Sequence, residues 1–166
     1  MSPTSIQRYC LALGLLLLGS ACAERTGTHE DELGVREAQI RYQFTSNAAA
    51  TKDVVDTFCI EMATEGRHSA RTDPPPALLE RFKDGPRKVR KESDCEYNET
   101  KGVFEKVTNK PALLLWTGKI TWKSATRATI TGGYYEGSMS ASGNLYYLEK
   151  RDGKWVVTKD EMEWIS

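Results

Sequence analysis

A strict alternation of apolar and polar residues constrains the C-terminal half of the chain. Apolar residues or glycine occupy the even positions of residues 112–122: Ala112, Leu114, Trp116, Gly118, Ile120 and Trp122. Thr117, Lys119 and Thr121 occupy the odd positions beyond Leu115. Because successive side chains of a strand point to opposite faces, the pattern predicts a long strand with one buried face, formed by the even positions.

The residues that follow predict three more strands. Ala128, Ile130 and Tyr134 alternate with polar residues, and Gly132-Gly133 predicts a bulge or bend. Residues 145–150 come next, and Asp152-Gly153 is a strong signal for a two-residue β-hairpin. Pairing across that turn sets Lys150 opposite Trp155 and puts four residues on one face: Tyr146, Leu148, Trp155 and Val157. The C-terminal half should therefore form a four-stranded meander.

The N-terminal half predicts a helix followed by shorter elements. Thr28-x-x-Asp31 has the form of a helix-capping box, and apolar residues then recur at helical spacing, so we expect one amphipathic helix over residues 31–46. The β-branched and aromatic stretch 54–62 predicts a strand. Beyond a proline-rich turn we expect a short helix at 77–82 and a strand at 88–92. These elements indicate an α+β domain.

This order of elements resembles the cone-shaped folds of the nuclear transport factor 2-like and cystatin-like superfamily. The resemblance covers residues 31–166 and includes the closing segments Tyr146-Tyr147-Leu148, Gly153-Lys154-Trp155-Val156-Val157 and Trp164-Ile165-Ser166. It implies that the N-terminal helix packs in the concavity of a bent antiparallel sheet. The likeness is one of fold, so it assigns no catalytic residue.

Residues 1–21 have the features of a secretory signal peptide. A polar start with the single cation Arg8 precedes the apolar run Leu11–Leu18, and small residues follow. The apolar run is shorter than the roughly 20 residues that span a bilayer, which argues against an uncleaved anchor. We therefore expect export, with residues 22–30 as a polar tether and residues 31–166 as a single domain.

The segment Leu18-Gly19-Ser20-Ala21-Cys22 resembles the lipobox of bacterial lipoproteins. The resemblance implies a lipid on Cys22 and cleavage just before it. The residue after the cysteine is Ala23 and not aspartate, which by the same resemblance implies sorting to the outer membrane. The alternative is cleavage after Ala23, which would release a secreted, soluble protein.

Cys59 and Cys95 remain in the exported chain under either cleavage. An even pair of cysteines in an oxidising compartment is most simply a disulfide. A zinc site is the competing interpretation, but neither His29 nor His68 stands at a finger-like spacing from a cysteine. We therefore expect a disulfide, with no metal and no cofactor.

Four aromatic residues on the predicted strands are candidates for a ligand pocket: Trp116, Trp122, Tyr134 and Trp155. Aromatic walls with a few polar groups are typical of small-molecule sites. The competing interpretation is that these side chains fill the core, where aromatic residues bury large areas.

Charged residues offer weaker candidates. A basic run, formed by Arg81, Lys83, Arg87, Lys88, Arg90 and Lys91, could contact an acidic polymer, lipid head groups or a protein, or could guard a strand edge. The formal net charge is +0, so a global basic field for nucleic acid is absent. Asp53 and Asp56 stand three residues apart, which puts them on opposite sides of a straight strand.

We find no serine nucleophile elbow, phosphate-binding glycine loop or zinc helix motif in the sequence. The sequence thus favours an exported lipoprotein whose non-catalytic domain binds an envelope protein or a ligand. The alternative is a small-molecule enzyme or carrier that uses an aromatic pocket in the concave sheet.

Overall fold

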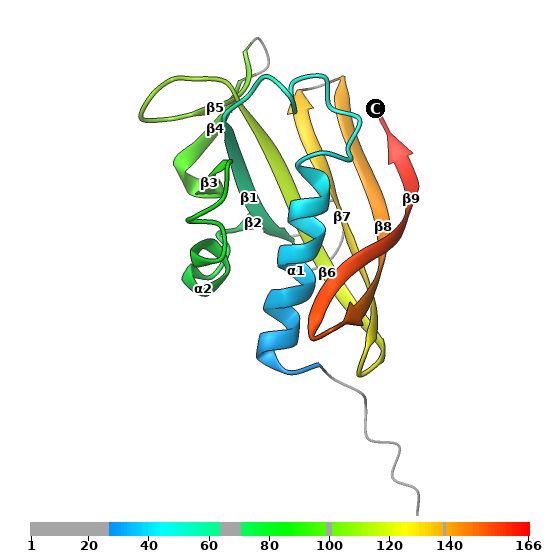
Figure 1. Ribbon diagram of the computed structural model, residues 1–166. Helices are drawn as coiled ribbons and strands as arrows, with labels where there is room; N and C mark the ends of the chain where they lie inside the picture. The colour runs from blue at the N-terminus through cyan, green and yellow to red at the C-terminus, as the bar shows by residue number, and fades with distance from the viewer. Residues whose placement is uncertain (1–26, 64–70, 99–100, 138) are drawn as a thin grey trace, which may run out of the picture.

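The computed structural model describes residues 27–63, 71–98, 101–137 and 139–166. The expected signal peptide, Cys22 and His68 lie outside these residues. One main helix, α1, accompanies a large and mostly antiparallel sheet (Figure 1). The elements in chain order are α1 His29–Gln43, β1 Thr57–Ala63, β2 Arg71–Thr72, α2 Pro76–Glu80, β3 Lys88–Lys91, the short 3₁₀ helix η2 Glu92–Asp94, β4 Cys95–Asn98, β5 Gly102–Glu105, β6 Ala112–Ser124, β7 Arg127–Gly137, β8 Ser140–Arg151 and β9 Lys154–Ile165.

The main sheet has seven strands in the described part of the chain. Six follow the order β2-β1-β6-β7-β8-β9, and β3 also pairs with β1. Strands β6 to β9 form the predicted antiparallel meander. The sheet is mostly antiparallel, in line with the expected antiparallel sheet, but β1 runs parallel to both β3 and β6. Parallel neighbours need long connections, and two helices lie between β1 and β6.

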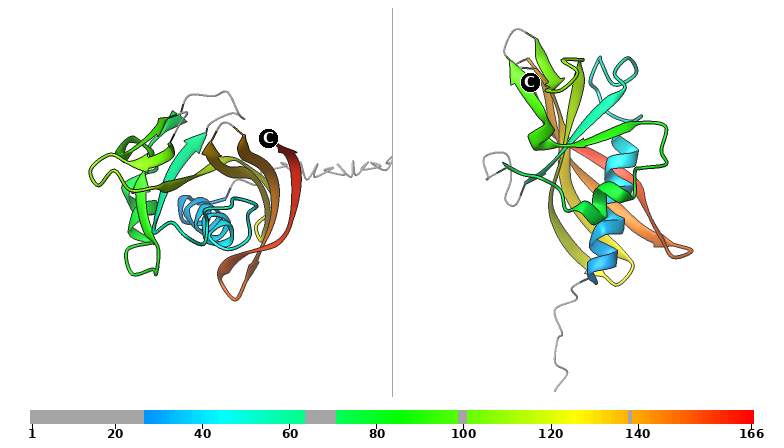
Figure 2. Two further views of the ribbon diagram at one scale, coloured as in Figure 1. Left: turned by 90° about the horizontal axis from the view of Figure 1, so that it is seen from above. Right: turned by 90° about the vertical axis from the view of Figure 1, so that its left-hand side faces the viewer.

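Helix α1 lies inside the curve of the sheet (Figure 2). The capping box forms as expected, since Thr28 Oγ1 accepts from Asp31 N and the Asp31 carboxylate accepts from Thr28. The helix begins at His29 and ends at Gln43, a few residues earlier than predicted at each end. Its C-terminal turn closes where the side chain of Asn47 donates to the carbonyl oxygen of Gln43.

A bulge in β6 overturns the expectation that its even positions share one face. Leu113 and Leu115 pack with α1, whereas Ala112 and Leu114 pack on the opposite face with the cysteine pair. The register with β7 shifts between Thr117 and Ile120, after which the even residue Ile120 faces α1. One inserted residue exchanges the two faces of a strand, because the side-chain period is two.

The hairpin β8–β9 forms as the sequence predicts. Lys150 pairs with Trp155, and Leu148 pairs with Val157. Asp152 and Gly153 both have positive φ, at 49° and 78°, as a type I′ turn requires.

A second, two-stranded sheet of β4 and β5 packs on the face of the main sheet that is turned away from α1. The predicted disulfide joins Cys59 of β1 to Cys95 of β4, with the Cα atoms 6.4 Å apart. Both cysteines are buried together with Val103 and Leu114. In the described residues, no helix is long and apolar enough to cross a membrane.

Candidate functional site

The structure does not bring the four candidate aromatic residues into one pocket. Tyr134 is 2% exposed and belongs to the core between α1 and the sheet. Trp122 and Trp155 pack edge to face, with ring centroids 5.7 Å apart, beside the N-terminal half of α1. Trp116 lies on the opposite face of the sheet, because it precedes the bulge in β6.

Trp116 instead belongs to a row of residues that crosses four strands. It pairs with Gly133, Gly133 pairs with Gly143, and Gly143 pairs with Trp164. A Cβ atom on Gly133 would lie 2.7 Å from Nε1 of Trp116, and one on Gly143 would lie 2.0 Å from Nε1 of Trp164. The two glycines thus leave room for both indoles to lie across the sheet.

A polar seam, which we define as Gln39, Tyr42, Gln43, Asn144, Tyr146 and Asp160, lies between α1 and strands β8 and β9. Tyr42 donates to Oδ1 of Asp160 over 2.8 Å, and Asn144 donates to Oδ2 over 3.2 Å. The rings of Tyr42 and Tyr146 meet edge to face. Burial, reinforced by the Asp160 carboxylate, raises the pKa of both phenols, so neither hydroxyl is a base at neutral pH.

Two glutamines of the polar seam are fully buried. Gln39 donates to the carbonyl oxygen of Trp116, but its Oε1 atom has no partner among the described residues. Both side-chain polar atoms of Gln43 lack a partner there as well. No pattern in the sequence predicted this seam. The available signal was the i, i+4 pair of glutamines next to the apolar stripe of the helix.

An open groove of about 480 Å³ runs along the other side of α1, between the end of α2 and the β8–β9 hairpin. We call it the α1 groove. Gly34, Ala38 and Trp155 form its apolar floor. A Cβ atom on Gly34 would lie 2.8 Å from Cδ1 of Trp155, so the glycine lets the indole lie close to the helix. Trp155 is the one candidate aromatic residue of the four that lines this groove.

Asp31 anchors one wall of the α1 groove. Its Oδ1 atom accepts from Lys150 Nζ at 2.6 Å and from Trp155 Nε1 at 3.1 Å. The hydrogen bonds from Lys150 and Thr28 outweigh the effect of burial and hold the pKa of Asp31 well below its usual range. This carboxylate therefore stays ionised and fixes the orientation of the indole.

Arg81 forms the opposite wall. Its guanidinium pairs with Glu30 and, over 2.9 Å, with Glu37, and Glu37 also accepts from Arg41 over 2.8 Å. Arg41 in turn donates to the carbonyl oxygen of Arg81. The two walls thus carry charges of both signs in fixed positions on either side of an apolar floor.

Four of the five other residues of the basic run are paired with acids in the described structure, and Arg87 binds a backbone carbonyl oxygen. Lys83 pairs with Glu80, and Lys91 pairs with Asp73. Lys88 and Arg90 both bind Glu105, and Arg87 donates to the carbonyl oxygen of Val55. These pairings favour the interpretation that the run stabilises the edge of the sheet around β3.

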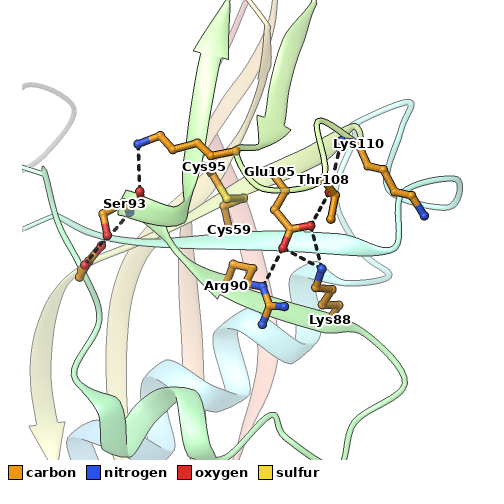
Figure 3. The surroundings of a disulfide bond; sticks show 10 residues. Cys59, Lys88, Arg90, Ser93, Cys95, Glu105, Thr108 and Lys110 are labelled. Atoms are coloured by element: carbon orange, nitrogen blue, oxygen red, sulfur yellow. Dashed lines mark hydrogen bonds and ion pairs between the residues drawn. A yellow bond between two sulfur atoms is a disulfide. The ribbon is translucent and has the colours of Figure 1, made fainter.

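Glu105 is the most heavily bonded carboxylate near the disulfide (Figure 3). Only 4% of its side chain is exposed, and it accepts from Lys88, Arg90 and Thr108. These donors, with Arg90 the strongest, lower the pKa of Glu105 to about 2. The cluster ties β3 to β5 around the cysteine pair and has a structural role.

The remaining candidates do not form a site. Asp53 and Asp56 lie exposed in the loop before β1, and His29 is exposed in the first turn of α1. Across the described ranges, no three histidine, cysteine, aspartate or glutamate residues are placed to hold a metal ion. No protein-family model, no curated protein and no solved structure matches this chain.

Proposed function

We propose that this protein is an exported lipoprotein, attached at Cys22, whose domain binds a segment of another envelope protein in the α1 groove without catalysing a reaction. The signal-like residues 1–21 and the lipobox-like segment support export and attachment. The curve of the sheet around α1 supports a cone-shaped fold of the nuclear transport factor 2-like or cystatin-like kind.

The composition and rigidity of the α1 groove carry this proposal. Arginine is enriched at the energetic centres of protein interfaces, and the groove presents Arg41, Arg81 and Lys150 around the accessible edge of Trp155, which is 7% exposed. Because these cations are already held by carboxylates, little side-chain entropy is lost on binding. Fixed charges of both signs suit a polypeptide segment better than a uniformly charged polymer.

The same bonding argues against acid–base catalysis in the groove. The lowered pKa of Asp31 makes it a poor proton acceptor at neutral pH. Glu37 accepts from two arginines, so its carboxylate is already committed to structure.

The alternative is a carrier or enzyme for a small polar molecule at the polar seam. The buried amide of Gln43, which has no partner in the described part of the chain, favours it, since such a group is costly unless it gains a hydrogen bond. A Gln43→Met variant that still captures its partner protein through the groove would count against this alternative.

Site-specific photo-crosslinking in intact cells tests the groove. A photoreactive residue in place of Arg41 should give one protein adduct of defined mass. The adduct should disappear when Arg81→Gln is added, since Arg81 holds a wall of the groove. It should persist with the matched control Lys83→Gln, which removes an exposed cation nearby. An adduct that still forms in the Arg81→Gln variant, or no protein adduct at all, would overturn the proposal.

Labelled fatty acid tests the anchor separately. The label should enter the wild-type chain and be lost in Cys22→Ser. A wild-type chain that takes up no label would contradict lipid attachment at Cys22. It would not bear on partner binding in the groove, which the crosslinking experiment tests.

A further inference from the structure

Three parts of the chain meet at one end of the molecule, which is the lower end in Figure 1: the start of α1, the β6–β7 hairpin and the β8–β9 hairpin. Contacts at Gly27 and Gly34 also bring these three parts of the chain together. A Cβ atom on Gly27 would lie 2.3 Å from the Trp122 ring near the first hairpin, and Gly34 contacts Trp155 at the start of β9. We call this end the anchor pole.

The anchor pole lies close to the proposed lipid. Gly27 is the first described residue, and Cys22 precedes it by five positions. Five fully extended residues span at most about 18 Å. A lipid on Cys22 would therefore keep the anchor pole within about that distance of the membrane surface.

The two hairpins present cations at this pole. Lys123 and Arg127 flank the β6–β7 turn, and Arg151 and Lys154 flank the β8–β9 turn. The side chains of Arg127 and Arg151 are 69% and 62% exposed. Both arginines share the single carboxylate of Glu149, at 3.5 and 3.1 Å, so their positive charge is only half compensated.

The acidic residues of the first turn of α1 do not cancel these cations. Each already has a cation of its own: Glu30 pairs with Arg81, Asp31 with Lys150 and Glu32 with Arg36. Lys123 and Lys154 are exposed, and neither forms an ion pair with another described residue. Asp152 lies in the turn of the second hairpin, two positions before Lys154.

We propose that the anchor pole docks on anionic phospholipid head groups through Lys123, Arg127, Arg151 and Lys154, so that the domain stands on its hairpin tips. Gly153 and Lys154 of the second tip also line one end of the α1 groove. This inference rests on the proposed lipid anchor. Each lysine or arginine near an anionic surface strengthens binding by about fivefold. Four such cations suffice for measurable binding to anionic vesicles without a tether, and the tether strengthens that binding by raising the effective concentration of the pole near the membrane.

Vesicle binding tests the pole without the lipid. The exported chain carrying Cys22→Ser is mixed with phosphatidylcholine vesicles that contain either no anionic lipid or about 30% phosphatidylglycerol. We expect binding to the anionic vesicles alone, with at least a tenfold loss on raising salt from about 50 to about 500 mM. Equal binding to both vesicles, or none to either, would overturn the inference.

Charge variants locate the surface. Changing Lys123, Arg127, Arg151 and Lys154 together to glutamine should weaken binding at least about tenfold. The control changes four lysines in the loops after α1 and on either side of β5, away from both hairpins, to glutamine: Lys52, Lys101, Lys106 and Lys110. It should stay within about twofold of the parent, because those residues are turned away from the membrane.

A pole variant that fails to fold is replaced by Lys123→Glu with Lys154→Glu, which alters only exposed lysines. Equal losses in the pole and control variants would show an effect of net charge and would contradict the inference. If the chain takes up no labelled fatty acid but still binds anionic vesicles, only the proposed lipid anchor is contradicted. If it takes up the label but does not bind the vesicles, only the proposed docking is contradicted.

Discussion

Nζ of Lys88 lies 2.7 Å from each carboxylate oxygen of Glu105. The two residues stand on β3 and β5, beside the disulfide that joins β1 to β4. Strands β4 and β5 are thereby bound to the main sheet, to β1 by the disulfide and to β3 by the charge cluster. Short strands with few backbone partners need such bonds, because each buries little apolar area of its own.

We expect Glu105→Gln to destabilise the protein by about 2 kcal/mol at neutral pH, since it removes charge-assisted hydrogen bonds from a buried acceptor. The folded-state pKa of about 2 lies below the ordinary value of 4.5. The carboxylate therefore stabilises the fold fully above about pH 4.5, and this contribution disappears as the pH falls towards 2.

Urea unfolding of both proteins at several pH values measures the difference. It should be largest at neutral pH and should shrink in acid. The control Glu80→Gln, on an exposed pair with Lys83, should change stability by less than about 0.5 kcal/mol. A difference for Glu105→Gln that grows as the pH falls would contradict this account.

Cys59→Ser and Cys95→Ser should each lower the free energy of unfolding by about 3–4 kcal/mol, because the bond closes a loop of 36 residues. The double variant should be no less stable than either single variant, since one bond is lost in all three. Alkylation of protein recovered from the periplasm gives the direct check. Two reactive thiols in the wild-type chain would disprove the disulfide in the cell.

Gly133→Ala should destabilise the sheet by about 3 kcal/mol. The new Cβ atom would lie 1.9 Å from the carbonyl oxygen of Ser142, which is backbone and cannot rotate away. Gly137→Ala is the matched control on the same strand, since no atom in the described part of the chain lies within 4 Å of its Cβ position. We expect the control to be neutral or to stabilise by up to about 1 kcal/mol. Thermal unfolding of both variants decides, and equal effects would refute the argument.

Gln43→Met should stabilise the purified protein by about 1–2 kcal/mol, because it removes two buried polar atoms that lack partners in the described structure. Gln39→Met should gain less, since it also gives up the hydrogen bond to Trp116. Chemical denaturation of the two variants measures both effects. A loss of stability in Gln43→Met would mean that the amide binds a water molecule or a ligand, and would favour the carrier alternative.

Several features were predictable because they depend on neighbours in the sequence. The capping box of Thr28 and Asp31 joins residues three apart, and the turn at Asp152 and Gly153 needs only their tolerance of positive φ. The pairing of Cys59 with Cys95 followed from having two cysteines left after the expected cleavage of the leader.

The candidate site was less predictable. Of the four candidate aromatic residues, Trp155 alone lines the α1 groove, and Arg81 of its opposite wall appeared in the sequence only as part of a basic run. The acids that hold Arg81 and Lys150, namely Glu37 and Asp31, lie 44 and 119 positions away from them. No local pattern reports a contact across such a separation.

The sequence by itself determined that residues 112–122 form a strand, that Asp152-Gly153 closes the β8–β9 hairpin and which stretch became α1. Only the tertiary structure decided that Trp116 and Trp122 face opposite ways and that β1 runs parallel to its neighbours. A hydrophobic period says which residues share a side of their own element. It does not say where an inserted residue exchanges the sides, or which element packs against them, because both depend on the packing of distant strands around α1.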